Sequence, residues 1–212
     1  MDQILTDIST NLQVGKAKIV VELVSKALAD GVPPKTILDE GLLAGMSVIG
    51  QKFKNNEVFV PEVLVAARAM NKGAELLKPA LAAEGVSARG VAVIGTVKGD
   101  LHDIGKNLVK MMMEGKGIEM HDLGVDVSPE RFVEAAQEHN ASIICLSALL
   151  TTTMTEMKNV VETVKASSLA GKVAIMVGGA PVTQAFCDQI GADCYTPDAA
   201  SAADEALRFL AS

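Results

Sequence analysis

From Val91 onward the sequence alternates between short apolar runs and amphipathic stretches, and this alternation limits the fold more than any other feature. The apolar runs predict strands at Val91–Thr96, Ile118–Leu123, Ser142–Ser147 and Val173–Val177, with a weak fifth at Cys194–Tyr195. The stretches between them predict helices at about Ile104–Gly115, Pro129–His139, Met154–Ser168, Pro181–Ile190 and Asp198–Leu210. This repetition predicts an open, parallel, five-stranded sheet with helices on both faces.

The first 80 residues have a different period, because their apolar side chains recur every three or four positions. Ile4, Ile8 and Leu12 mark one helix, and the same spacing marks three more. Four helices with short loops predict an antiparallel bundle. Small residues from Lys78 to Gly90 predict a connecting segment. The expected class is therefore α/β, with a four-helix domain (1–80), a linker (81–90) and a flavodoxin- or Rossmann-like five-stranded domain (91–212).

Composition excludes several classes of protein. In 212 residues, 19 Lys plus Arg stand against 26 Asp plus Glu, and this net charge of -7 argues against a nucleic-acid partner. No apolar run reaches the roughly 18 residues of a membrane span, so no membrane partner is expected. Three cysteines without a CxxC pair argue against disulfides and zinc. They favour a reducing compartment, and a cytoplasmic location is expected.

The loop after the first predicted strand carries the most chemical information. Its glycines have neither the GxGxxG spacing of a dinucleotide site nor the spacing of a phosphate loop. What remains is Asp100-x-His102-x-x-Gly105 at a strand-to-helix turn. Imidazole binds transition metals, and a nearby carboxylate can accept its other ring N–H. With one histidine here, a metal would have to bring its remaining ligands, as a macrocycle does. The alternative is a helix-capping aspartate beside a surface histidine.

The stretch Asp100-Leu101-His102-Asp103-Ile104-Gly105 resembles the motif of base-off/His-on cobalamin-binding proteins. Ser147-Ala148-Leu149 and Gly178-Gly179, at later strand ends, resemble that family's Ser-x-Leu and Gly-Gly motifs. The resemblance implies that His102 replaces the dimethylbenzimidazole tail as the lower ligand of cobalt. It further implies that the other two stretches line a slot for the tail.

Finer assignments follow from the same resemblance. Thr153 would complete a relay from Thr153 through Asp100 to His102, and Thr151 would contact the tail; the alternative for both hydroxyls is a capping or turn role. Tyr195 and Ala199 would close the far end of the slot. The implied catalytic residues are His102, Asp100 and Thr153, with His102 as the metal ligand. The implied cofactor contacts in this half are Asp100, His102, Asp103, Ile104, Gly105, Ser147, Leu149, Thr151, Thr153, Gly178, Gly179, Tyr195 and Ala199.

The N-terminal half resembles the four-helix cap of the cobalamin module of methionine synthase and of small corrinoid proteins of methanogens and acetogens. The matching residues include Gly45-Met46, Phe53 and the stretch Phe59-Val60-Pro61-Glu62-Val63. The resemblance implies that Phe53, Val60 and Val63 cover the methyl face of the cofactor. The alternative is that these side chains belong to the core of the bundle.

Together these resemblances imply a methyltransferase cognate corrinoid protein that binds cobalamin, as methylcobalamin or hydroxocobalamin, or a related cobalt corrinoid. A substrate-specific methyltransferase would load the methyl group onto Co(I). A second methyltransferase would pass it from methyl-Co(III) to a folate-type acceptor such as tetrahydrofolate. A reductive activation protein is also implied, and the chain alone would have little activity. The alternatives are an adenosylcobalamin mutase small subunit, a cobalamin-dependent regulator, and a cofactor-free interaction domain.

Overall fold

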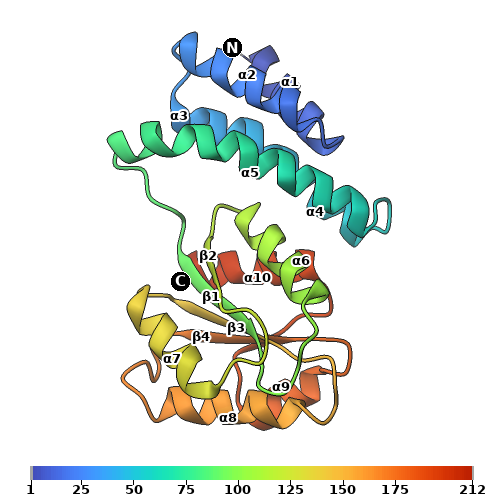
Figure 1. Cartoon of the computed structure of the whole chain (residues 1–212), viewed down its shortest axis with the longest axis vertical. Helices are drawn as coiled ribbons and strands as arrows, with labels where there is room; N and C mark the ends of the chain where they lie inside the picture. Colours follow the sequence, from blue (N-terminus) through green and yellow to red (C-terminus); the bar gives the residue numbers. More distant parts are fainter. Residues whose placement is uncertain (1, 212) are drawn as a thin grey trace. The chain divides into compact units, whose positions relative to one another are not determined.

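The computed structural model describes residues 2–211, and the chain divides into two compact units (Figure 1). The first unit comprises the residues up to Ala88 together with Gly115–Gly117. The second comprises Arg89–Glu114 and the residues from Ile118 onward. No helix in residues 2–211 combines the length and the apolar character that a membrane crossing requires.

The first unit is entirely helical, as its periodicity predicts. Its elements are α1 (Asp2–Gln13), α2 (Ala17–Ala29), α3 (Pro34–Thr36), η1 (Ile37–Leu43), α4 (Ala44–Lys54) and α5 (Val60–Ala83). The segments α3, η1 and α4 follow one another without a break, so they form one helical stretch with a π-helical middle. Apolar side chains from every long helix, such as Ile8, Val24, Met46 and Leu77, are buried in the core of this unit.

The predicted start of the connecting segment is wrong, because α5 continues through Pro79 to Ala83. A proline inside a helix removes one backbone hydrogen bond. The helix nevertheless continues, since Leu77 is fully buried just before the proline and the alanines that follow it have high helix propensity. Only residues 84–90 therefore remain as non-helical connection before the first strand.

The second unit has the predicted alternation of strands and helices. Its elements are β1 (Val91–Thr96), α6 (Ile104–Glu114), β2 (Glu119–Asp122), α7 (Pro129–Glu138), β3 (Ile143–Ser147), α8 (Met154–Lys165), β4 (Ala174–Gly178), α9 (Gln184–Ile190), β5 (Cys194–Tyr195) and α10 (Ala199–Ala211). All strand pairs are parallel, in the order β2-β1-β3-β4-β5. The predicted fold class, an α/β chain with a helical first part and a five-stranded parallel sheet, is confirmed.

One predicted helix begins too early. The sequence predicts a helix from Pro181, whereas α9 begins at Gln184. Thr183 has an extended backbone, and its side-chain oxygen accepts a hydrogen bond from the backbone N–H of Phe186 at 3.2 Å. Threonine in this role satisfies a backbone donor that the first turn leaves unpaired, so it fixes where the helix starts.

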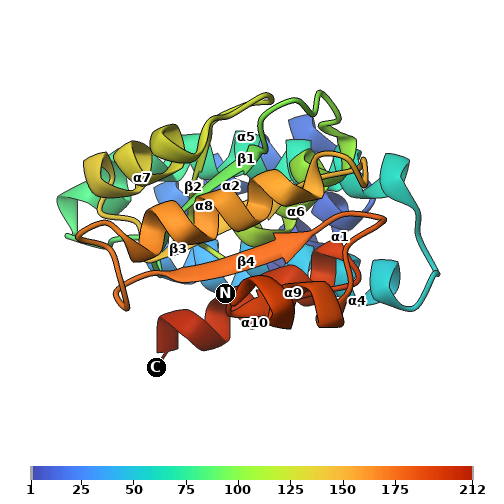
Figure 2. The same cartoon turned by 90° about the horizontal axis from the view of Figure 1, so that it is seen from below.

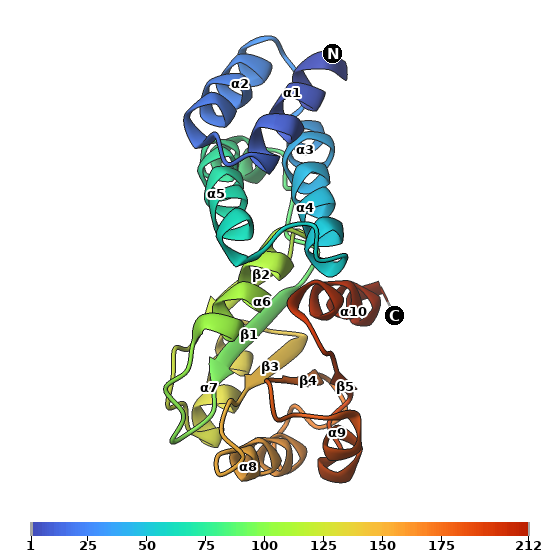
Figure 3. The same cartoon turned by 90° about the vertical axis from the view of Figure 1, so that its right-hand side faces the viewer.

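Helices cover both faces of the sheet, which explains why its strands are almost continuously apolar. Helices α6 and α10 pack together on one face, and α7, α8 and α9 lie on the other (Figure 3). Figure 2 shows α7 and α8 side by side. Phe132 of α7 and Met157 of α8 are fully buried against strand residues such as Val93 and Ile144. The helices leave the carboxyl ends of the strands free to form loops.

A buried charge ties α6 to the end of β2. Lys106 is only 3% exposed, and its Nζ donates to Asp122 Oδ1 at 2.6 Å and to Asn107 Oδ1 at 2.8 Å. Asp122 Oδ1 also accepts the N–H of Gly124 at 2.9 Å. Burial acts to raise the pKa of Asp122, but the hydrogen bonds from Lys106 and Gly124 outweigh it, and the pKa lies below its ordinary value.

We expect Lys106→Met to destabilise the folded protein by about 2 kcal/mol or more, because removing one partner leaves the other charge poorly compensated. Urea denaturation followed by circular dichroism measures this change. Lys110→Met is the matched control, since Lys110 Nζ lies 3.4 Å from Asp122 Oδ2 and its side chain is 30% exposed. Its loss is expected to cost less than about 1 kcal/mol. Equal effects of the two substitutions would contradict the role given to burial.

Candidate functional site

Two loops meet at the carboxyl edge of the sheet, after β1 and after β3. The two strands are direct neighbours, and the last residues of each, Thr96 and Ser147, pair in register. From β1 the chain continues into α6 on one face, whereas from β3 it continues into α8 on the other. A crevice forms where neighbouring strands send their chains to opposite faces, and such crevices are where open α/β sheets bind ligands.

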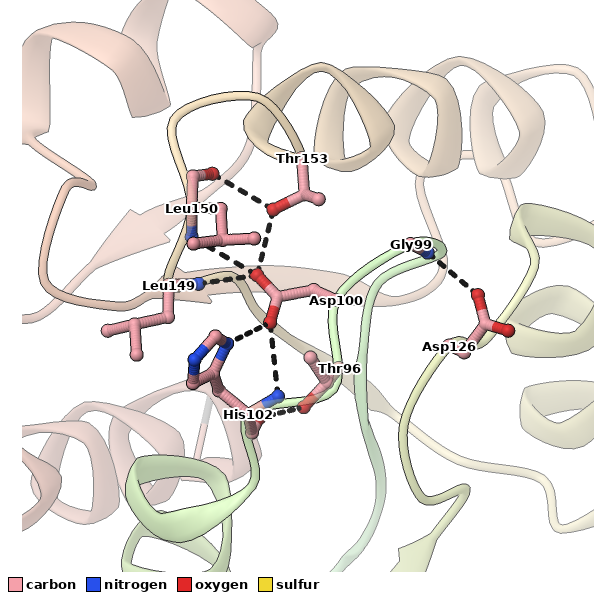
Figure 4. Close-up of polar contacts among 8 residues, drawn as sticks. All are labelled: Thr96, Gly99, Asp100, His102, Asp126, Leu149, Leu150 and Thr153. Atoms are coloured by element: carbon pink, nitrogen blue, oxygen red, sulfur yellow. Dashed lines mark hydrogen bonds and ion pairs between the residues drawn. The ribbon is translucent and has the colours of Figure 1, made fainter.

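The carboxylate of Asp100 is the centre of this site (Figure 4). Its Oδ1 accepts the backbone N–H of His102 at 3.1 Å and lies 2.7 Å from the ring Nδ1 of His102. Its Oδ2 accepts the backbone N–H groups of Leu149 at 2.8 Å and Leu150 at 3.2 Å. The hydroxyl of Thr153 lies 2.8 Å from the same Oδ2 and 2.9 Å from the carbonyl oxygen of Leu150. The β1 and β3 loops are thus joined through one buried side chain.

These contacts determine the charge of Asp100. Burial acts to raise the pKa of the carboxyl, but hydrogen bonds from the His102 ring, from the N–H groups of Leu149 and His102, and from Thr153 outweigh it. The pKa of Asp100 is therefore held well below its usual range. An ionised carboxylate only accepts hydrogen bonds, so Nδ1 of His102 carries the proton. The lone pair of a neutral imidazole is then on Nε2.

The surface around His102 is open and apolar. The His102 side chain is 50% exposed, and Leu101 and Ile104 on either side are 71% and 75% exposed. Leu149 and Leu150 on the facing loop are exposed as well. A Cβ added at Gly105 would meet no atom within 4 Å. Large exposed apolar groups gathered around a half-exposed imidazole are typical of a binding surface.

The stretches assigned to the tail slot come together at the ends of β3, β4 and β5. Ser147 pairs with Gly178, whose carbonyl oxygen accepts the N–H of Ala148 at 3.2 Å. A Cβ at Gly178 would have only Thr196 O nearby, at 3.9 Å, so this backbone faces open space. Gly179 differs, because its φ is +138° and a Cβ there would lie 1.9 Å from the carbonyl oxygen of Ala148.

The other predicted site residues differ in how exposed they are. Thr151 is exposed on the turn after β3, Tyr195 is half-buried in β5, and Ala199 is buried at the start of α10. Asp103 is exposed, and its Oδ2 accepts a hydrogen bond from the Asn107 side chain at 3.1 Å. In the helical unit, Phe53 and Val60 are partly exposed and Val63 is buried. Their roles as cofactor contacts remain predictions.

Three residues of the site were not identified from the sequence: Thr96, Asp126 and Leu150, whose backbone N–H donates to Asp100. The hydroxyl of Thr96 donates to the carbonyl oxygen of His102 at 2.8 Å, and Asp126 Oδ1 accepts the N–H of Gly99 at 2.7 Å. Thr96 could have been noticed in the sequence, because it is a polar residue at the end of an otherwise apolar strand. No sequence pattern points to Asp126, because no spacing relates it to Gly99.

Comparison with known proteins identifies relatives over the full chain. A family model described as a B12 binding domain matches residues 90–207, and a second of the same description matches residues 4–78. Dimethylamine corrinoid protein 3 of Methanosarcina acetivorans is 46% identical over 92% of this chain and 91% of its own. The dimethylamine corrinoid protein of Methanosarcina barkeri is 43% identical over 99% of both. A chain of the crystal structure of the methanol:cobalamin methyltransferase complex MtaBC from Methanosarcina barkeri superposes with a TM-score of 0.90, at 30% identity, over all of this chain and 81% of its own.

The geometry of the site fits a cobalt corrinoid. Nε2 of a histidine whose Nδ1 is bonded to a carboxylate has the chemistry of a metal ligand, and a macrocycle would supply the remaining ligands of the metal. The open backbone at Gly105 and the exposed leucines leave room for a broad, flat ligand with apolar faces. With two matching family models and relatives that are similar over nearly its whole length, the chain belongs to the B12-binding family of corrinoid proteins.

Proposed function

We propose that this protein carries a methyl group between a substrate-specific methyltransferase and a methyl acceptor. The observation that carries the proposal is the His102 imidazole, held by a buried, ionised Asp100 with its Nε2 available. The corrinoid, when bound, supplies the cobalt on which the methyl group travels, since a cofactor of this kind performs the difficult chemistry. The protein supplies binding, orientation and shielding from water.

In this proposal His102 would hold the metal through Nε2. Asp100 is a positioning residue, because its carboxylate fixes the tautomer and the orientation of the ring and makes the imidazole a stronger ligand. Thr153 positions Asp100 from the β3 side, together with the backbone N–H groups of Leu149 and Leu150. Three donors from β3 and two from His102 hold this carboxylate, so the imidazole has little freedom to turn.

The remaining contacts extend the proposal to the rest of the cofactor. Residues at the ends of β3 to β5 would hold the displaced nucleotide tail, and the bare backbone at Gly178 gives it a flat surface. The exposed apolar residues of the β1 loop would face the ring. An apolar cover from the helical unit follows from its resemblance to the cap of related proteins. The proposed contacts are Asp103, Ile104, Gly105, Ser147, Leu149, Thr151, Gly178, Gly179, Tyr195 and Ala199, with Phe53, Val60 and Val63 for the cover.

We further propose a methylated amine as the methyl donor. Relatives named as dimethylamine corrinoid proteins are 46% and 43% identical, whereas the chain of the methanol complex is 30% identical. The alignments cover 91% and 99% of the lengths of these two relatives, so the similarity extends over both units. A second methyltransferase with a folate-type acceptor and a reductive activation protein complete the proposed set of partners.

A reconstitution experiment tests the function and the donor together. The purified chain is loaded with hydroxocobalamin, desalted and reduced, and then mixed with dimethylamine and a dimethylamine methyltransferase, or with methanol and its methyltransferase. We expect one corrinoid per chain, and a change in its visible spectrum on methylation with the amine pair only. Methylation by the methanol pair alone would contradict the donor assignment. A chain that retained no corrinoid would contradict the function itself.

A further inference from the structure

The loop between β2 and α7, residues 123–128, contains none of the site residues predicted from the sequence, yet it bonds to the backbone on both sides of Asp100. Asp126 Oδ1 accepts the backbone N–H of Gly99 at 2.7 Å (Figure 4). The backbone N–H of Asp126 donates to the carbonyl oxygen of Asp100 at 3.0 Å. One residue thus bonds to the peptide group before Gly99 and to the peptide group after Asp100. Together the two bonds fix the backbone from which the Asp100 side chain extends.

Both partners in this contact have backbone conformations that few residues tolerate. Asp126 has a φ of +56°, and Gly99 has a φ of +79°. Aspartate and asparagine adopt this left-handed region more readily than other residues with a side chain, and glycine does so without strain. A side-chain oxygen that accepts a backbone N–H within a turn stabilises that turn, as the Oδ1 of Asp126 does for Gly99. The side chain at position 126 therefore stabilises the turn that presents Asp100.

The loop that contains Asp126 is itself bonded to the ends of β1 and β2. Gly124 O accepts the N–H of Thr96 at 3.0 Å, and the N–H of Val127 donates to Thr96 O at 3.0 Å. Gly124 N–H also donates to Asp122, the partner of the buried Lys106. Bonds on both sides of Asp126 fix the loop to the end of β1. Its side chain is exposed, so changing it removes a hydrogen bond and little packing.

We propose that Asp126 is a positioning residue that fixes the backbone of Asp100 and so sets the orientation of His102 as an axial ligand of cobalt. The inference rests on the proposed function. The β3 loop holds the carboxylate of Asp100, whereas Asp126 holds its main chain, and the ring of His102 depends on both. Without the side-chain bond from Asp126, the N–H of Gly99 loses its acceptor. The turn that presents Asp100 to Nδ1 of His102, 2.7 Å away, is then held by fewer bonds.

Three substitutions at Asp126 distinguish the contribution of the hydrogen bond from that of the backbone conformation. Asp126→Asn keeps an acceptor oxygen and the tolerance for a positive φ, Asp126→Gly keeps only the conformation, and Asp126→Ala keeps neither. Asp193→Ala is the control, because Asp193 Oδ2 accepts the N–H of Ile175 at 2.7 Å at the opposite end of the sheet.

The first readout is the rate of amide hydrogen exchange at Gly99, measured by NMR on the protein without cofactor. We expect about tenfold faster exchange with Gly and Ala, and wild-type exchange with Asn and with Asp193→Ala.

The second readout is coordination of the metal by His102. The proteins are loaded with cob(II)alamin, and the nitrogen splitting in the electron paramagnetic resonance spectrum reports the fraction with an axial imidazole. We expect the equilibrium constant for His102 coordination to fall about fivefold or more in Asp126→Gly and Asp126→Ala. It should be unchanged in Asp126→Asn and Asp193→Ala.

The outcomes distinguish this inference from the function on which it rests. A wild-type protein that retained no corrinoid would overturn the proposed function and this inference with it. Wild-type coordination that persisted unchanged in Asp126→Gly would overturn the inference alone. Equal losses in the Asn and Gly variants would show that the negative charge matters rather than the accepted bond, and would also overturn the positioning role.

Discussion

His102→Ala is expected to abolish coordination of the corrinoid cobalt by the protein and to weaken retention of the cofactor by more than about 100-fold. The expectation follows from the geometry, because His102 is the half-exposed imidazole beside Asp100, and the carboxylate fixes Nδ1 as the protonated nitrogen. Loss of a partner outside the first ligand shell already costs about 10- to 100-fold in metal sites, and loss of the ligand itself should cost more.

Visible spectra and cofactor retention after desalting measure this effect. The spectrum should change from a form with an axial nitrogen to one without it. His139→Ala is the control, because His139 lies at the end of α7 and stacks on His121 with ring centroids 3.5 Å apart. It should bind cofactor like the wild type. Free imidazole should restore the axial nitrogen in His102→Gly. A His102→Ala protein with an unchanged spectrum would refute the assignment of the metal ligand.

The second large effect is expected at Gly179. Gly179→Ala should destabilise the protein by about 3 kcal/mol or more, because a side chain in this conformation is strained and has no room. The φ of +138° belongs to a region that is almost restricted to glycine, and the new Cβ would lie 1.9 Å from Ala148 O and 2.9 Å from Ala148 C. Both atoms are backbone at the end of β3, so the loop could relieve the contact only by moving.

Gly178→Ala is the matched control and separates folding from binding. Gly178 has no positive φ, and a Cβ there would have one neighbour within 4 Å, at 3.9 Å. Its effect on stability, measured by urea denaturation without cofactor, should stay within about 0.5 kcal/mol. The added methyl group should nevertheless reduce corrinoid retention, because it occupies the surface proposed for the tail. If Gly179→Ala were as stable as Gly178→Ala, the close approach of the β3 and β4 loops would be disproved.

Most of the helices and strands could be predicted because the burial of their side chains produces a recognisable pattern of apolar residues in the sequence. Strands covered by helices on both faces need apolar residues at almost every position, and β1 has the same bounds in prediction and structure. The errors fall at ends that local patterns do not determine. Helix α5 passes through Pro79 because Leu77 is buried in its unit, and α9 starts late because the hydroxyl of Thr183 caps it.

How well each site residue could be predicted depends on how far along the chain it lies from its partner. Asp100 and His102 are two residues apart, so the turn that follows β1 brings them together almost by itself. Thr153 is far along the chain, and only the resemblance to a known motif connected it with Asp100; in the structure the two side chains lie 2.8 Å apart. Asp126 belongs to no motif that we recognised, and its bond to Gly99 became visible only in the folded chain.

The sequence by itself determined the two kinds of periodicity, the alternation of strands and helices, and the short pattern that places an aspartate beside a histidine. These features depend on residues that are close along the chain, where side-chain burial and hydrogen bonding act within a few positions. The tertiary structure alone decided that β1 lies between β2 and β3. That order brings the loops of all three strands to one edge, where Thr153 holds the carboxylate of Asp100 and Asp126 holds its backbone. Strand order is set by how the whole sheet and its helices pack, and no local pattern encodes it.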